Sequence, residues 1–256
     1  MASDLTTFAL KLAAAARAET LPRWRDGVTA EHKGDGAFDP VTDADREGER
    51  VMRALIEQHF PDHGVSGEEF GVTGGTSPFT WSLDPVDGTR SFMCRLPTWT
   101  TLIALLENGE PVLGVIDAPV LGETYVGRGG QSWLYGNENN VEVRTSGCTS
   151  IDDARLSTTD PYLFNEPRPF ERIRERAKVT RYSHDGYAYA CVAAGSLDLV
   201  IESGLKAHDY TALIPVVRGA GGYIGDWNGG EDFGPGQVIA AATRELYEEA
   251  VTLLSE

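Results

Sequence analysis

Two aspartates lie three residues apart in the segment Ser82–Phe92 (SLDPVDGTRSF), with a proline between them and Gly88-Thr89 directly after. Neighbouring carboxylates repel each other unless a proton or a cation lies between them, and Mg²⁺ prefers carboxylate oxygens as protein ligands. At the start of a helix, Gly88 and Thr89 would present backbone N–H groups, which bind phosphate oxygens. The segment therefore offers two candidate metal ligands, Asp84 and Asp87, beside a candidate anion site. The alternative is an aspartate-stabilised turn followed by an ordinary helix N-cap.

Three other acidic stretches could contribute to the same site. Glu68 and Glu69 occupy a glycine-flanked loop, where a solvated acidic turn is the simpler explanation. Asp43 and Asp45 precede a helical pattern, where acidic side chains also complement the positive end of the helix dipole. Asp209 opens a further helix after an apolar strand, a position typical of an N-cap residue. Taken one at a time, each stretch has a structural explanation as well as a catalytic one.

The elements expected to position these residues begin with two amphipathic helices. Apolar residues recur at helical spacing in residues 4–18 and again in residues 41–60. Thr42 and Asp45 have the spacing of an acidic capping box at the start of the second helix. The stripe expected to be buried in that helix is Val51, Leu55, Ile56 and Phe60.

A run of strands follows the second helix. Residues 80–84 (TWSLD) predict a short strand that leads into the paired aspartates. Residues 100–119 predict a hairpin, because two apolar runs flank the turn pair Asn108-Gly109. We expect residues 123–127 and 130–136 to add further strands to the same sheet.

The pattern changes after about residue 140, where shorter strands and helices alternate. Residues Tyr187–Ala194 predict a helix of small residues, and Leu197–Glu202 predict an apolar strand. The helix that Asp209 opens should be kinked or divided at Pro215. The final helix is expected over residues 243–256.

The fold class follows from this alternation. A chain of 256 residues can form one large domain or two lobes that share a core. We predict a layered α/β (α+β) fold with lobes at 1–140 and 141–256 and a boundary near 138–150. The first lobe would carry the metal and phosphate site. The second would carry the last metal ligand and the residues that select the substrate.

Composition limits the function classes. Hydrophobic residues make up 41% and charged residues 24%, as in folded soluble proteins, and no apolar run reaches the roughly 18 residues of a membrane span. The formal net charge of −17 argues against nucleic acid or an anionic membrane as a partner. The N-terminus does not resemble a signal peptide, and Cys94, Cys148 and Cys191 form no CxxC pair. A cytoplasmic location is therefore expected.

Taken together and in this order, the acidic stretches resemble the inositol-monophosphatase superfamily of metal-dependent phosphatases over about residues 35–230. The resemblance implies an αβαβα layered sandwich and a homodimer. The motifs that carry it are Gly67-Glu68-Glu69, Asp84-Pro85-Val86-Asp87-Gly88-Thr89, and Asp209 followed by Ala220-Gly221-Gly222.

By position, the resemblance implies a role for each acidic residue. Thr89 and Asp45 would orient the attacking water, Glu68 would share in catalysis, and the N–H groups of Gly88 and Thr89 would hold the phosphate. Two or three Mg²⁺ ions, with Mn²⁺ or Zn²⁺ as substitutes, would neutralise the phosphate and activate the water for in-line attack. Such ions would also explain how so acidic a protein binds an anion. The implied metal ligands are Glu68, Asp84, Asp87, Asp209 and the carbonyl of Val86.

The second half of the chain is similar to one branch of the superfamily, the histidinol-phosphate phosphatases. The similarity lies in residues 95–123 and 184–206, and the branch's Asp-Cys-Tyr-Ala-Tyr segment corresponds here to residues 185–189 (DGYAY). The superfamily usually opens the last ligand helix with Trp-Asp, and this branch with Tyr-Asp-Tyr. This chain has His208-Asp209 and departs from both forms.

Asp185 and Glu202 are the predicted substrate-binding residues. The position that matches Asp185 is small and neutral in inositol-phosphate enzymes, whereas a carboxylate there would suit a cationic amine or imidazolium. Glu202 lies where the superfamily contacts its substrate. The alternatives are a helix N-cap for Asp185 and a solvated strand end for Glu202. Tyr187 and Tyr189 are expected to be core residues.

These residues predict a Mg²⁺-dependent phosphomonoesterase that converts L-histidinol phosphate into L-histidinol and phosphate, a step of histidine biosynthesis. The main alternative is an inositol-1-monophosphatase or a broad-specificity sugar or polyol phosphatase. A more distant one is a metal-dependent binding protein that kept the scaffold without its activity. In each case the expected partner is a small phosphate ester or other small ligand, with no nucleic acid and no membrane.

Overall fold

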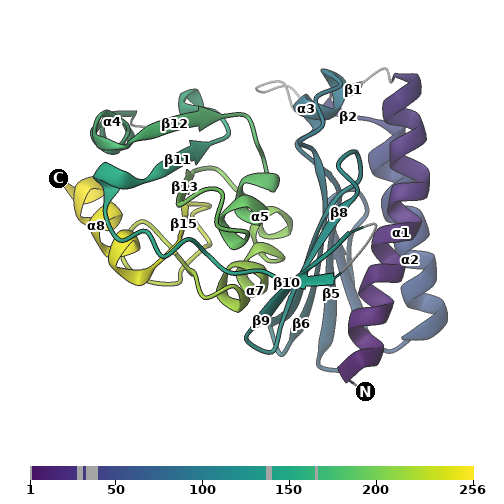
Figure 1. The fold of residues 1–256 in the computed structure, drawn as a ribbon. Helices are drawn as coiled ribbons and strands as arrows, with labels where there is room; N and C mark the ends of the chain where they lie inside the picture. Colours follow the sequence, from purple (N-terminus) through teal and green to yellow (C-terminus); the bar gives the residue numbers. More distant parts are fainter. Residues whose placement is uncertain (1, 28–30, 33–39, 137–139, 165–166) are drawn as a thin grey trace.

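The computed structural model describes residues 2–27, 31–32, 40–136, 140–164 and 167–256. Its elements form five layers, helix–sheet–helix–sheet–helix, which confirms the expected αβαβα sandwich (Figure 1). Among the described residues, no helix is both long and apolar enough to cross a membrane.

The helices differ widely in length, and two short 3₁₀ turns accompany them. The 3₁₀ turns are η1 (Ile151–Asp153) and η2 (Pro161–Leu163). The α-helices in the described parts of the chain are α1 (Ala2–Asp26), α2 (Asp43–His59), α3 (Thr89–Met93), α4 (Pro167–Arg176), α5 (Tyr187–Ala193), α6 (Ala207–Tyr210), α7 (Leu213–Gly219) and α8 (Arg244–Ser255).

The strands form two large sheets and one two-stranded ladder. The first sheet has the order β10-β9-β8-β7-β6-β5-β3-β4, the second has the order β12-β11-β13-β15-β14, and β1 pairs with β2. The bounds are β1 (Glu31–His32), β2 (Pro40–Val41), β3 (Gly64–Gly67), β4 (Gly71–Thr73), β5 (Phe79–Asp87), β6 (Thr100–Glu107), β7 (Glu110–Ala118), β8 (Glu123–Arg128), β9 (Gln131–Tyr135), β10 (Asn140–Glu142), β11 (Arg155–Thr158), β12 (Val179–Tyr182), β13 (Leu199–Glu202), β14 (Tyr223–Gly225) and β15 (Val238–Ala241).

The helices cover the sheets from three sides. α1 and α2 lie together on one face of the first sheet, α5 and α7 fill the space between the sheets, and α4 and α8 cover the outer face of the second (Figure 1). β10 still belongs to the first sheet and β11 to the second, so the chain crosses from one sheet to the other between Glu142 and Arg155. α7 nevertheless packs directly against β7, β8 and β9, so residues of the second half complete the core of the first.

The apolar pattern predicts the buried face of α1 correctly but that of α2 only in part. In α1 the predicted Phe8 and Leu12 are buried as expected. In α2 the buried apolar residues are Met52 and Ile56, whereas Val51 and Leu55 are only half-buried. The predicted stripe is correct at Ile56, and Leu55 and Phe60 pack against the same core while only partly buried. The stripe is shifted by part of a turn, because the face of α2 nearest the first sheet also buries polar groups, among them Glu49.

The predicted β6–β7 hairpin is confirmed. Asn108 and Gly109 both have positive φ, 53° and 89°, as a two-residue turn between twisted strands requires. Gly114 and Gly127 face α7, and a Cβ atom at either position would overlap the backbone carbonyl of Ala212 or Pro215. These two glycines allow α7 to lie directly on the sheet.

The segment after Asp209 is divided as the proline suggested. α6 ends at Tyr210, α7 begins at Leu213, and the break lies between them. Pro215 is the third residue of α7, in the first turn, where its missing N–H removes no helical hydrogen bond.

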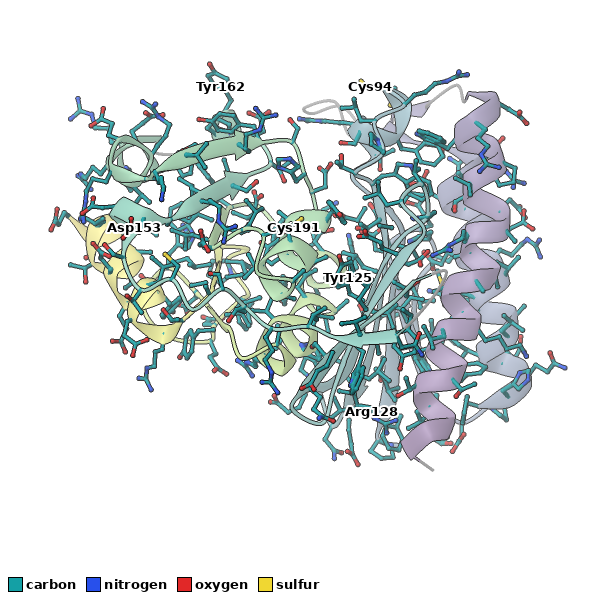
Figure 2. All side chains as sticks on the ribbon, in the orientation of Figure 1. Cys94, Tyr125, Arg128, Asp153, Tyr162 and Cys191 are labelled. Carbon is teal, nitrogen blue, oxygen red and sulfur yellow. The ribbon has the colours of Figure 1, made fainter. Side chains whose placement is uncertain are left out.

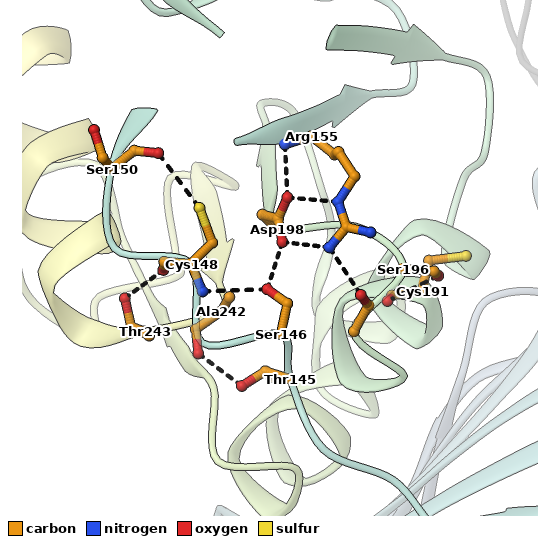
Figure 3. Close-up of polar contacts among 11 residues, drawn as sticks. Thr145, Ser146, Cys148, Ser150, Arg155, Cys191, Ser196, Asp198, Ala242 and Thr243 are labelled. Carbon is orange, nitrogen blue, oxygen red and sulfur yellow. Dashed lines mark hydrogen bonds and ion pairs between the residues drawn. The ribbon is translucent and has the colours of Figure 1, made fainter. Parts of the chain in front are cut away.

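A buried carboxylate fastens the crossover segment to the second sheet (Figure 3). Asp198 is 2% exposed and accepts hydrogen bonds from the Arg155 backbone N–H and guanidinium, each at 2.7 Å. It also accepts one from the Ser146 hydroxyl. Nearby, Thr145 donates to the Ala242 carbonyl and Thr243 to the Cys148 carbonyl, both at 2.8 Å.

Replacing Asp198 with alanine should lower the free energy of unfolding by about 2–3 kcal/mol at pH 7, because several hydrogen bonds to a charged group are lost. Burial alone would raise the pKa of Asp198, but the hydrogen bonds from Arg155 and Ser146 outweigh it and the pKa is lowered. The contribution is therefore complete above the unfolded pKa of about 3.9 and is lost as the pH falls through the lower folded-state pKa. Urea unfolding at several pH values measures this. If the exposed Asp153→Ala variant loses as much unfolding free energy as Asp198→Ala, the predicted role of Asp198 is contradicted.

Candidate active site

A cavity of about 430 Å³ opens where the two halves of the chain meet. Its walls come from β5, α3, α5, β13 and α6, so both sheets contribute to it. Figure 2 labels Tyr125 of β8 and Cys191 of α5, which belong to the core where the middle helices pack against the first sheet. The lining includes every residue predicted to bind metal, phosphate or substrate: Glu68, Asp84, Val86, Asp87, Gly88, Thr89, Asp185, Glu202 and Asp209.

The paired aspartates belong to β5 itself and not to a turn after it. The ladder with β6 shifts register between Asp84, opposite Leu102, and Asp87, opposite Thr100, so β5 is bulged there. The strand was expected to end at Asp84, but the bulge accommodates Pro85 and carries the strand on to Asp87.

Asp84 and Asp87 meet the aspartate of α6. One carboxylate oxygen each from Asp84, Asp87 and Asp209 lie within 4.8 Å of one another. Asp87 Oδ2 is held by the Thr100 hydroxyl at 2.9 Å and by the Gly186 N–H at 2.6 Å. The structure therefore brings the paired aspartates together with Asp209, which lies more than 120 residues later in the sequence.

A second acidic cluster lies next to the first. Oxygens of Asp45, Glu68 and Glu69 also lie within 4.8 Å of one another. Asp45 Oδ2 accepts from the N–H of Thr42 at 2.8 Å and from its hydroxyl, while Oδ1 lies 3.5 Å from the Thr89 hydroxyl. The structural and catalytic explanations of Asp45 are thus compatible, because one oxygen caps α2 and the other faces Thr89, which lines the cavity.

The pKa shifts of the carboxylates in these clusters indicate whether the site suits a cation. Burial, together with the charge of Glu68 and of the two other aspartates, raises the pKa of Asp84 well above its usual value. Burial and the charges of Asp185 and Asp209 raise the pKa of Asp87 in the same way. Buried carboxylates that oppose one another's ionisation are an oxygen-only donor set that a hard divalent cation would stabilise. The residues present therefore fit the implied metal.

His208 brings an imidazole nitrogen close to this set. Its Nε2 lies 3.5 Å from Asp209 Oδ1 and 3.9 Å from Glu68 Oε1. The sequence pattern singled it out only as a departure from the usual aromatic residue. The structure shows that it borders the cavity between the two acidic clusters.

The predicted phosphate cradle lies at the start of α3. Gly88 has φ 82° and ψ 44°, a left-handed conformation that favours glycine, and it directly precedes Thr89, the first residue of the helix. A Cβ atom at Gly88 would lie 2.7 Å from the Asp185 carboxylate. The glycine therefore permits both the turn and the approach of the second half of the chain.

Asp185 faces the cavity and does not cap a helix. The N-cap residue of α5 is Gly186, and Asp185 has φ 48°, which is an uncommon conformation for a side-chain-bearing residue. Its Oδ2 accepts a hydrogen bond from the Ser91 hydroxyl at 2.5 Å. The N-cap alternative is excluded, and strain of this kind is typical of functional sites.

Glu202 is buried rather than solvated. It is 3% exposed, and Oε1 accepts from the N–H of Thr159 at 2.6 Å and from its hydroxyl at 2.8 Å. Oε2 accepts from the Thr158 hydroxyl at 3.3 Å. Burial raises the pKa of Glu202 to about 8. The solvated strand-end alternative is therefore excluded for this residue.

The two tyrosines predicted as core residues differ from each other. Tyr187 is half-buried and donates to Glu123 Oε2 at 3.0 Å, away from the acidic clusters. Tyr189 is 2% exposed and belongs to the core between the sheets, yet it also lines the cavity. Tyr189 is therefore a core residue as predicted, but it also borders the candidate active site.

Two positions were missed because their signals are not local. Glu69 was treated only as the neighbour of Glu68, although both carboxylates join Asp45. Gly186 stands where the resemblance has cysteine, and only the fold shows that its N–H supports Asp87. The sequence signal for this support of Asp87 is the glycine that stands next to Asp185, where the resemblance has a residue with a side chain.

Comparison with known proteins settles the family. The model of the inositol monophosphatase family matches residues 1–256. The chain belongs to this family. Its members are metal-dependent phosphatases, and the arrangement of carboxylates described above is consistent with that activity. The predicted superfamily and enzyme class are therefore confirmed.

Individual relatives support the same conclusion. The chain is 43% identical over 228 residues to the bifunctional phosphatase IMPL2, chloroplastic, of Arabidopsis thaliana, a match that covers 84% of this chain and 65% of that protein. It is 36% identical over 259 residues to the histidinol-phosphatase of Mycobacterium tuberculosis, covering 96% of each. An inositol monophosphatase structure from Zymomonas mobilis superposes with a TM-score of 0.87 at 37% identity, covering 99% of this chain and 98% of that one. These relatives carry different substrate names, so they establish the phosphatase family and not the substrate.

Replacing Gly186 with alanine should weaken Mg²⁺ binding about tenfold, as is typical when a group that orients a ligand is disturbed. The added Cβ would lie 2.6 Å from Asp87 Oδ2 and 2.8 Å from the Thr100 hydroxyl, and it would displace the carboxylate. Calorimetric titration with Mg²⁺ measures the change. The matched control is Gly74→Ala, whose Cβ would meet no atom within 4 Å. Equal affinities in both variants would show that Gly186 does not position Asp87.

Replacing Asp84 with asparagine should stabilise the metal-free protein while abolishing turnover. The substitution removes one of several buried charges that repel one another. Thermal unfolding with and without Mg²⁺ should show a higher Tm in EDTA and a much smaller increase on adding Mg²⁺ than in the unsubstituted protein. Retained turnover, or an unchanged response to Mg²⁺, would reject Asp84 as a ligand.

Proposed function

We propose that this protein is a Mg²⁺-dependent phosphomonoesterase that hydrolyses L-histidinol phosphate to L-histidinol and phosphate. The observation that carries the proposal is the presence of two carboxylates, the half-buried Asp185 and the buried Glu202, in the cavity wall supplied by the second half of the chain. Both lie outside the acidic clusters that fit the metal. A substrate with a cationic amine and an imidazole gives these two carboxylates partners that a neutral polyol does not.

The proposed metal ligands are the four acidic side chains and one backbone carbonyl that converge on the cavity. When bound, Mg²⁺ would neutralise the phosphate, activate the attacking water and stabilise the leaving oxygen. Val86 is buried, and its carbonyl accepts the Thr89 hydroxyl at 3.2 Å from within the bulge. The ligands would be Glu68, Asp84, Asp87, Asp209 and the Val86 carbonyl.

Thr89 and Asp45 are proposed to orient the attacking water, with Glu68 assisting from the same cluster. The Thr89 hydroxyl lies between Asp45 Oδ1 and the Val86 carbonyl, and it can donate to only one of them at a time. When this hydroxyl donates to Asp45, the Thr89 oxygen can still accept a hydrogen bond from a water. Burial raises the pKa of Asp45 to about 6, so above that pH the carboxylate can accept the proton of the nucleophile.

The phosphate itself would be bound by backbone. The N–H groups of Gly88 and Thr89 lie at the start of α3, where helical geometry provides them with no partner inside the helix. A backbone cradle of this kind recognises the phosphate in any ester, so it does not distinguish substrates. Discrimination must come from the opposite wall.

Electrostatics favour a cationic leaving group at that wall. At neutral pH the raised pKa of Glu202, about 8, reflects a buried carboxylate without a cationic partner. An ammonium or imidazolium beside it would stabilise the charged form. Asp185 is half-buried, and desolvation raises its pKa, although the Ser91 hydrogen bond and the charge of Arg90 act in the opposite direction. Each carboxylate would gain from binding one nitrogen group of the substrate.

A general inositol or sugar phosphatase is the second candidate, and the structural similarity to an inositol monophosphatase is its specific support. Phosphate release with Mg²⁺ should be compared for L-histidinol phosphate, inositol 1-phosphate and fructose 1,6-bisphosphate. We expect a preference for histidinol phosphate in kcat/KM of about a hundredfold, equivalent to about 2.7 kcal/mol. Similar values for all esters would favour a broad-specificity phosphatase. Mg²⁺ binding without any turnover would favour a binding protein.

Replacing Asp185 with serine should raise the KM for histidinol phosphate at least tenfold, because an ionic partner of the substrate is lost. The KM for inositol 1-phosphate should change less than threefold, because that ester has no cation. Initial rates at saturating Mg²⁺ measure both. The exposed Asp153→Ser serves as a control for the loss of one negative charge. Equal increases in KM for the two esters would contradict the specificity assignment and would leave the proposed metal chemistry unaffected.

Assembly and location remain further proposals. We propose a homodimer, as the family resemblance implies, and light scattering at micromolar concentration measures it directly. A monomer at all concentrations would reject it. A reducing cytoplasm is proposed from Cys94, Cys148 and Cys191, which are all free thiols.

A further inference from the structure

The loop between β3 and β4 carries Glu68, which lines the cavity, and Glu69, which joins the acidic cluster beside it. Glu68 and Glu69 both bring oxygens within 4.8 Å of Asp45, where like charges repel one another. The loop is short, since β3 ends at Gly67 and β4 begins at Gly71. On one side it is attached to β5 by the Glu68 N–H, which donates to the Leu83 carbonyl at 3.2 Å.

The other attachment is a buried carboxylate from α2. Glu49 is 0% exposed, and its Oε2 accepts the N–H of Glu69 at 2.7 Å. Its Oε1 accepts the N–H of Phe70 at 3.2 Å. Two successive backbone amides of the loop therefore converge on one side chain. Phe70 is 52% exposed, so packing of its ring does not hold this part of the loop.

An arginine one turn along α2 completes the attachment. Arg53 donates through Nε to Glu49 Oε1 at 2.6 Å. Its two terminal nitrogens donate to the Thr73 hydroxyl, at 3.1 Å, and to the Gly71 carbonyl. Glu49 and Arg53 thus hold both the start of β4 and the loop that precedes it.

The sequence of the loop fits this arrangement. A Cβ atom at Gly67 would overlap the Glu49 carboxylate. The glycine next to Glu68 is therefore required where the side chain of α2 reaches the loop, and any other residue would push Glu49 away from the two amides.

We propose that Glu49 is a positioning residue that sets the metal affinity of the site by holding the backbone of the Glu68-Glu69 loop. It does not act as a ligand, because both of its oxygens already accept hydrogen bonds from the loop or from Arg53. Without this attachment, the repulsion among Asp45, Glu68 and Glu69 would move the loop outward in the metal-free protein. Binding a cation would then require the loop to be brought back, and affinity would fall. The inference rests on the proposed role of Glu68 as a ligand.

The test is Glu49→Gln in the full-length chain. The amide keeps the size of the side chain but replaces one acceptor oxygen with an NH₂ group, so one loop amide loses its partner. We expect Mg²⁺ binding, measured by calorimetry, to weaken by about ten- to a hundredfold, as for other groups that orient metal ligands. At saturating Mg²⁺, kcat should stay within about threefold. A lower Tm that is equal with and without Mg²⁺, together with unchanged Mg²⁺ affinity, would show a merely structural role and overturn the proposal.

Three companion variants make the outcome unambiguous. Gly67→Ala displaces the same carboxylate from the other side and should weaken Mg²⁺ binding even if Glu49→Gln fails to fold. Glu57→Gln, an exposed position on the same helix, should leave the affinity unchanged. Glu68→Gln reports on the proposed function itself. If it leaves Mg²⁺ affinity intact, the ligand role of Glu68 is wrong. If it weakens Mg²⁺ binding while Glu49→Gln and Gly67→Ala do not, only the positioning role is wrong.

Discussion

The structure is organised around the repulsion between buried carboxylates. Asp84 and Asp87 lie in one wall of a cavity, with Asp209 opposite and a second acidic cluster beside them. Burial and mutual charge both raise the pKa values of Asp84 and Asp87, so the site opposes its own ionisation until a cation enters. A net charge of −17 adds to this opposition at longer range. A phosphate ester can approach such a surface only where metal ions reverse the local field.

The rest of the fold supplies the fixed groups that hold these charges in place. The bulge in β5 sets the spacing of its two aspartates, and backbone or hydroxyl donors hold Asp87 from both sides. The capping box fixes one oxygen of Asp45 and leaves the other toward Thr89. Tight contact between the halves depends on glycines, at Gly88 and Gly186 in the cavity and at the surface where α7 meets the sheet. The acidic clusters draw on both halves of the chain, because Asp209 comes from the second half and the other members come from the first.

Much of the site could be predicted from the sequence, because its signals are local. The Asn108-Gly109 turn and the Thr42–Asp45 spacing each determine their structure within a few residues. The end of β5 was misplaced because Pro85 argues against a strand, and only pairing with β6 shows that a bulge accommodates it. The buried face of α2 was misplaced because an apolar pattern does not count Glu49, whose partners lie 20 and 21 residues away. The burial of Glu202 likewise depends on Thr159, 43 residues away in sequence.

The adjacency of Asp185 and Gly186 has a consequence for how this enzyme's affinities are measured. Asp185 is the proposed contact for the substrate's amine, and the next N–H in the chain holds Asp87, a proposed metal ligand, at 2.6 Å. A shift of this dipeptide toward a bound amine therefore also moves the support of a proposed metal ligand. With these proposed roles, occupancy at the two positions would be thermodynamically linked, and the linkage would be reciprocal: the factor by which metal changes substrate affinity would equal the factor by which substrate changes metal affinity. A substrate dissociation constant for this protein accordingly has meaning only at a stated free concentration of divalent cation.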